Sequence, residues 1–120
     1  MLIILSIKKR SQKTGNPLSY NSFLEKVIPY AQKKRVGIIG MKVYFRGLAK
    51  RLPWFDTMEP FFHFALSQSI TTAVIGCDSI LQLVENVQIA ARFSPMSDEM
   101  IKTLIRNVTP FARRLMYYKH

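Results

Sequence analysis

Short apolar runs rich in β-branched residues alternate with stretches of helical pattern, and this alternation most limits the possible folds. The runs span residues 2–7, 36–43 and 71–75, and their length and composition are typical of strands. A helical pattern follows each run, so the expected order is β-α-β-α-β-α-α-α. Such an order predicts parallel strands with right-handed helical crossovers. It does not separate a doubly wound sheet from an arc of a barrel.

Start signals place the expected helices. Ser22 with Glu25, and Ser79 with Gln82, have the spacing of a capping box, in which each side chain satisfies an unpaired amide. Pro29 falls inside the first helix, where we expect it to produce a kink. The predicted helices cover residues 22–35, 57–67, 79–91 and 97–107, and a last one starts at 109–110. The basic segments 8–18 and 44–57 are predicted to be loops.

The third of these helices has a clear apolar periodicity. Its apolar residues recur at helical spacing, and we expect them to form the face that packs on the core. They are Ile80, Leu83, Val84, Val87 and Ala91.

The chain is strongly basic. It has 18 Lys plus Arg against 7 Asp plus Glu, a formal charge of +11. Such a charge can attract nucleic acid, anionic lipid or phosphorylated ligands, or it can be a solvated surface without such a partner. The basic residues form no recognisable nucleic-acid-binding module, so we do not expect nucleic acid as the partner.

Cysteine usage and hydropathy bear on location. The single cysteine, Cys77, excludes an internal disulfide and fits a reducing compartment. The apolar residues 1–7 precede basic residues, the reverse of a signal peptide. No run approaches the roughly 20 apolar residues that span a bilayer. We expect a cytoplasmic chain without a membrane partner.

Three sequence motifs resemble those of a known family. Residues 36–47 read VGIIGMKVYFRG, residues 71–86 read TTAVIGCDSILQLVEN, and residues 93–97 read FSPMS. In this order they resemble the seventh barrel strand of aldo/keto reductases with its glycine loop, the eighth strand with the helix after it, and the lead-in to the C-terminal helices. The resemblance covers roughly residues 20–112.

The resemblance implies a fold and a domain organisation. The expected fold is α/β, the C-terminal part of a (β/α)₈ TIM barrel, with about three parallel strands, flanking helices and extra C-terminal helices. Residues 1–120 would form one partial domain, in which 1–19 are a divergent strand and basic loop and 20–120 are the family-like segment.

The same resemblance implies contacts to NADP(H). Met41 lies where the family places a residue against the nicotinamide. The positions that touch the pyrophosphate are Lys42, Tyr44 and Gly47. The positions that grip the 2′-phosphate end are Gly76, Cys77, Gln82, Glu85 and Asn86. A helix N-terminus offers free amides and a partial positive charge, which suit a phosphate.

Structural roles explain the same residues without a cofactor. Met41 is then a core residue and Lys42 a solvated charge. Segment 76–82 is a capped helix start after a strand, and Asn86 holds the loop by a backbone hydrogen bond. His63, among phenylalanines and without a second ligand at metal-binding spacing, is expected to be structural.

Much of the barrel is missing. A complete barrel needs about 200 or more residues. The family's catalytic Asp, Tyr, Lys and His or Glu belong to its first half, and nothing in residues 1–20 corresponds to them. We therefore identify no catalytic residue and expect no independent reductase activity. The open sheet edges predict self-association or assembly with a missing N-terminal half. The alternative function is a non-enzymatic, basic nucleotide- or nucleic-acid-binding module.

Overall fold

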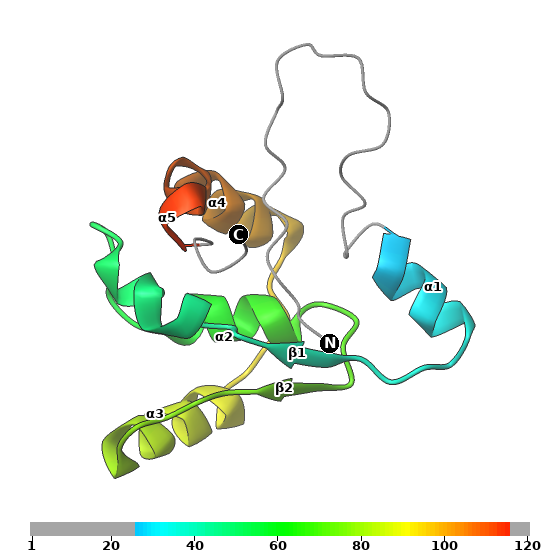
Figure 1. Ribbon diagram of the computed structural model, residues 1–120, viewed down its shortest axis with the longest axis horizontal. Helices are drawn as coiled ribbons and strands as arrows, with labels where there is room; N and C mark the ends of the chain where they lie inside the picture. Colours follow the sequence, from blue (N-terminus) through cyan, green and yellow to red (C-terminus); the bar gives the residue numbers. More distant parts are fainter. Residues whose placement is uncertain (1–25, 116–120) are drawn as a thin grey trace.

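Two short parallel strands and the helices around them form the part of the chain that the computed structural model describes, residues 26–115 (Figure 1). Strand β1 (Ile39–Met41) pairs with β2 (Thr72–Val74), with Gly40 opposite Ala73. The predicted parallel pairing is confirmed, although the paired segments are shorter than the predicted runs. The strand predicted at 2–7, the loop at 8–18 and the helix start at Ser22 lie outside the described residues.

A helical crossover joins the two strands, as the alternation predicts. It consists of the segment η2 (Phe45–Arg51), two short 3₁₀ turns joined by a kink at Arg46 and Gly47, and helix α2 (Glu59–Leu66), which packs on β2. The prediction of a loop over 44–57 is therefore wrong for its first half. Phe45, Ala49 and Leu52 are buried, so they anchor this basic segment to the core.

The helices after β2 begin where their capping residues predict. Helix α3 (Ile80–Ala91) is capped by Ser79, whose Oγ accepts a 3.2 Å hydrogen bond from the Gln82 amide. Helix α4 (Asp98–Val108) is capped in the same way by Ser97. The 3₁₀ turn η3 (Thr109–Phe111) and helix α5 (Ala112–Leu115) follow, with Pro110 in the first turn of η3.

Helix α1 (Ile28–Lys33) precedes the sheet. Pro29 stands in its first turn, where the missing amide of proline matters least. Residues 26–27, just before α1, are π-helical. The backbone therefore departs from regular α-helix geometry at the start of α1, close to Pro29, and not in the middle of the helix. Ile28 and Ala31 pack with Ile38 in a small apolar cluster beside the sheet.

The main core is aromatic and lies between η2, α2 and the C-terminal helices. Phe61 of α2 is only 1% exposed. Its ring meets that of Phe45 edge-on, with centroids 5.8 Å apart, and stacks on Trp54 at 6.0 Å. Leu104, Val108 and Leu115 from α4 and α5 close the same cluster. Full burial of one such side chain stabilises the fold by about 1.5–3 kcal/mol.

The predicted core face of α3 is exposed, so that prediction is wrong. Ile80 and Val87 are among its exposed side chains. The buried residue of α3 is Ile89, and α3 packs on α2. Periodicity identified which residues of α3 share a face, but α2 and the loop after β1 pack against the opposite face of this helix.

Among residues 26–115, no helix combines the length and the apolar character that crossing a bilayer requires.

Candidate functional site

A pocket of about 310 Å³ opens where the two strands end. Its walls are the segment after β1, the start of η2, the segment after β2 and the first turns of α3. Sites at the carboxyl ends of parallel strands are common, because the loops that follow adjacent strands converge there. The lining residues are Lys42, Val43, Tyr44, Arg46, Gly47, Lys50, Met58, Val74, Ile75, Gly76, Asp78, Gln82, Glu85 and Asn86.

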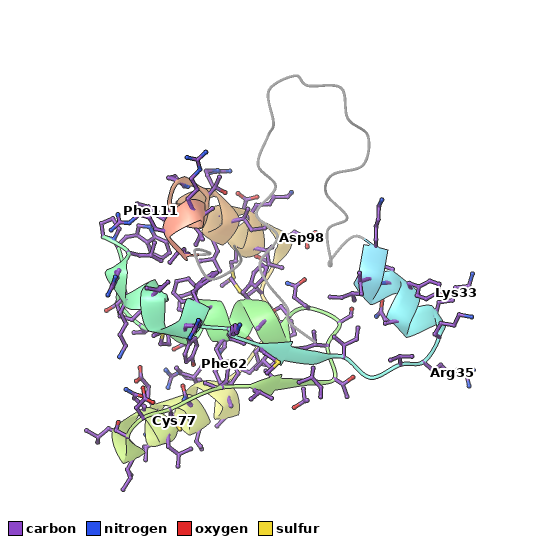
Figure 2. The ribbon with its side chains drawn as sticks, in the orientation of Figure 1. Lys33, Arg35, Phe62, Cys77, Asp98 and Phe111 are labelled. Carbon is purple, nitrogen blue, oxygen red and sulfur yellow. The ribbon has the colours of Figure 1, made fainter. Side chains whose placement is uncertain are left out.

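Most of the predicted cofactor contacts line this pocket. Those that do are Lys42, Tyr44, Gly47, Gly76, Gln82, Glu85 and Asn86. Met41 and Cys77 are not among the lining residues. Met41 lies on the open face of the sheet and is 36% exposed, so it is not the core residue of the structural alternative. Cys77 is an exposed free thiol in the turn that leads into α3 (Figure 2).

A hydrogen bond between side chains joins the two halves of the pocket. The Tyr44 hydroxyl donates to Asn86 Oδ1 at 2.8 Å, across 42 positions in the sequence. The Tyr44 ring also meets Phe62 edge-on at 6.1 Å. Asn86 thus holds the loop after β1 through a side chain, and not through the backbone bond that the structural alternative predicts.

The environment of Tyr44 disfavours its ionised form. Partial burial raises the pKa of its hydroxyl well above the ordinary value, and the nearby Glu85 carboxylate raises it further. Tyr44 therefore holds its proton firmly and serves as a fixed hydrogen-bond donor to Asn86.

The backbone of the pocket wall is strained. Lys42, Phe45 and Arg46 have φ angles of 57°, 51° and 57°, in the left-handed region that non-glycine residues rarely adopt. Gly47 follows at 83°, where the lack of a side chain removes the penalty. Strained residues of this kind cluster at binding and catalytic sites, because only a strong structural constraint retains them.

The start of α3 already satisfies two of its own amides. The Gln82 amide donates to Ser79 Oγ, and the Gln82 side-chain Oε1 accepts a 2.8 Å hydrogen bond from the Asp78 amide. A side chain added at Gly76 would meet no atom within 4 Å. The turn before α3 is thus open beside Gly76 and closed at Asp78.

Charges of both signs line the pocket. Lys42, Arg46 and Lys50 come from the segment after β1 and from η2, and Asp78 and Glu85 come from the segment after β2 and from α3. The cations suit an anionic group, and the carboxylates limit how strongly the pocket attracts one. Sequence reasoning missed Arg46 and Lys50 as lining residues. No regular spacing in the sequence marks them, because positive φ angles at Phe45, Arg46 and Gly47 interrupt the segment.

His63 lies outside the pocket and connects two helices. Its Nε2 is 3.2 Å from the carbonyl oxygen of Ile89, and its ring meets Phe93 edge-on at 5.3 Å. Its Nδ1 lies 4.0 Å from Glu59. These contacts are structural, as expected. The described part of the chain gathers no group of three His, Cys, Asp or Glu that could hold a metal ion.

Comparisons of this chain with protein-family models, with curated proteins and with solved structures find no match. The family resemblance therefore rests on the sequence motifs alone.

Proposed function

We propose that this chain is the C-terminal part of an aldo/keto reductase-like barrel that retains part of an NADP(H) phosphate site. One observation carries the proposal. Residues that the resemblance assigns to the cofactor come from two segments far apart in sequence, and they line one pocket whose halves are joined by Tyr44 and Asn86.

The pocket fits the phosphate end of the cofactor better than the whole dinucleotide. Its volume of about 310 Å³ lies at the small end of ligand pockets. Lys42, Arg46 and Lys50 would hold the phosphates, and the open turn at Gly76 would let one approach the backbone. The nicotinamide, when bound, supplies the hydride in the family that the chain resembles.

Independent reductase activity is not part of the proposal. A carbonyl reduction needs a positioned proton donor. The tyrosine of the pocket, Tyr44, already donates to Asn86, and its raised pKa makes it a weak acid. The chain would therefore contribute binding and no proton transfer.

The open face of the sheet supports a missing remainder of the barrel. Gly40 and Ala73 turn toward the body of the protein, whereas Ile39, Met41 and Val74 on the other face are exposed. Strands of a parallel sheet are normally covered on both faces. We propose that a missing N-terminal half, or a further chain at the sheet edges, covers this side. The free thiol of Cys77 supports a cytoplasmic location for the assembly.

An NADPH titration of the full chain, followed by cofactor fluorescence at low and moderate salt, tests the proposal. We expect saturable binding that persists at moderate salt. Lys50→Gln should weaken it by about threefold to tenfold, because one favourable charge contact near a phosphate contributes about 1 kcal/mol. Lys102→Gln on α4 makes the same change at an exposed position outside the pocket and should leave the affinity unchanged.

The basic-module alternative predicts a different result. A single-stranded oligonucleotide would then bind more tightly than NADPH, and its binding would fall steeply with salt. Lys50→Gln and Lys102→Gln would weaken it equally, because such binding sums over the whole charged surface. Absence of saturable NADPH binding at low salt would overturn the proposed cofactor site.

A further inference from the structure

A second, smaller pocket of about 140 Å³ lies where η2 meets the C-terminal helices. It shares no lining residue with the pocket at the strand ends. Its walls come from two parts of the chain that are far apart in the sequence and that the fold brings together, since α5 contacts η2 (Figure 1). The lining residues are Leu48, Arg51, Leu52, Phe111, Arg114 and Leu115.

Most of this lining is apolar. Leu52 and Leu115 are buried and belong to the main core, and Leu48 and Phe111 are partly buried and pack against that core. The volume of the pocket is close to that of an apolar cavity of about 150 Å³, which is enough to hold one benzene molecule. The pocket can therefore accommodate a single ring-sized apolar group.

The two remaining lining residues are arginines from different elements. Arg51 is the last residue of η2 and Arg114 lies in α5, and both are exposed. Within residues 26–115, no carboxylate lines this pocket and neither arginine forms an ion pair. Two positive charges at one small pocket repel each other, and an anion in the pocket would be attracted by both.

The sequence around both arginines is also free of carboxylates. Residues 45–55 contain three Lys or Arg and no Asp or Glu, and residues 100–115 contain four Lys or Arg and no Asp or Glu. The pocket at the strand ends differs in this respect, because Asp78 and Glu85 line it and limit its attraction for an anion. The charge of the second pocket is thus complementary to an anionic ligand.

We propose that this second pocket binds a small aromatic carboxylate. The ring of the ligand packs against Leu48 and Phe111, and its carboxylate accepts hydrogen bonds from Arg51 and Arg114. A guanidinium group presents its N–H donors as a planar fork that matches the two oxygens of a carboxylate. Burial of the ring removes apolar surface of both ligand and pocket from water. This site does not depend on the proposed cofactor site.

Titration of the full chain with benzoate and with phenylacetate, followed by amide chemical shifts in NMR spectra, tests the proposal. We expect saturable binding of at least one of them, with a dissociation constant of roughly 1 mM. Arg51→Gln and Arg114→Gln should each weaken it by about threefold to tenfold, because each removes one charge-assisted contact. Arg113→Gln makes the same change at an exposed position of α5 outside the pocket and should leave the affinity unchanged.

Two further probes separate the contributions of the ring and of the charge. Benzyl alcohol keeps the ring without the charge, and acetate keeps the charge without the ring, so each should bind at least about tenfold more weakly than benzoate. The proposal is overturned if neither aromatic carboxylate binds saturably, if benzyl alcohol or acetate binds as tightly as benzoate, or if Arg113→Gln weakens binding as much as Arg114→Gln. NADPH affinity should be the same in Arg114→Gln as in the natural chain, so the two sites can fail independently.

Discussion

The Tyr44 hydroxyl lies 2.8 Å from Asn86 Oδ1, and this bond fastens the loop after β1 to the middle of α3. Both walls of the pocket depend on it, because Tyr44 precedes the strained residues of η2 and Asn86 lies one helical turn beyond Gln82. The bond therefore couples the shape of the pocket to the stability of the fold.

Replacement of Tyr44 by Phe should lower the free energy of unfolding by about 1 kcal/mol, because it removes one partly buried hydrogen bond and keeps the ring contact with Phe62. Urea unfolding measures the change. Tyr30→Phe removes a hydroxyl from an exposed ring and should have no effect. Asn86→Ala combined with Tyr44→Phe should cost less than the sum of the single changes, and full additivity would contradict the coupling.

A titration to alkaline pH should show that the Tyr44 hydroxyl keeps its proton to a higher pH than an ordinary tyrosine. Burial, and then Glu85, raise the folded-state pKa of its hydroxyl above the unfolded value of about 10. Its stabilising contribution is complete below that value and is lost as the pH rises toward the folded-state pKa, since the unfolded chain releases the proton first. A spectrophotometric titration should show one late-ionising tyrosine, and Tyr44→Phe should eliminate it. An unchanged titration in that variant would argue against a protected hydroxyl.

Acid should weaken the contact between α2 and the end of α3. Arg92 Nη2 and Nε donate to Glu59 Oε2 at 2.6 and 3.0 Å, and these bonds lower the pKa of the Glu59 carboxyl. The contribution of a carboxylate with a lowered pKa is present above the unfolded value of about 4.3 and is lost as the pH falls through the folded one. Thermal unfolding between pH 3 and 6 should therefore differ between the natural chain and Arg92→Met, and the two curves should converge at the acid end. Arg106→Met removes an exposed arginine from α4 and should leave the pH dependence unchanged.

Truncation of Phe61 should be the most damaging single change in the core. Its ring contacts both Phe45 and Trp54, so Phe61→Ala leaves a cavity and should cost about 3–5 kcal/mol. Chemical denaturation gives the value, and Phe61→Leu should recover part of it. Met100→Ala, at an exposed position of α4, should change the stability by no more than about 0.5 kcal/mol. Equal effects of Phe61→Ala and Met100→Ala would show that the aromatic cluster is not the main core.

Capping residues predicted the starts of α3 and α4 more accurately than the orientation of α3. Ser79 and Ser97 act on amides three residues away, so their sequence neighbours suffice to identify the caps. The direction in which α3 turns its apolar face depends on α2 and on Tyr44, which are distant in sequence. Periodicity thus correctly identified the apolar face of α3, but it led to the wrong prediction that this face is buried in the core.

The site was predictable only in part, for a related reason. Sequence motifs led us to predict cofactor contacts in the loop after β1 and at the start of α3. Arg46 and Lys50 were missed as lining residues, because segment 44–57 was predicted to be a loop and its kinked 3₁₀ turns follow no regular residue spacing. The left-handed backbone at Phe45 and Arg46 has no counterpart in residue propensities, since it is imposed by packing.

The crossover between β1 and β2 also determines when the pocket can form. Ile38 bonds to Thr71 across 33 positions, and Tyr44 bonds to Asn86 across 42. Bringing together residues that are far apart in the sequence costs conformational entropy before their contacts stabilise the fold. Pairings of this kind therefore form slowly. During synthesis, a chain that has emerged only as far as β2 still lacks the Asn86 side of its pocket. We therefore expect the pocket to form late in biogenesis, after α3 has left the ribosome and docked on α2.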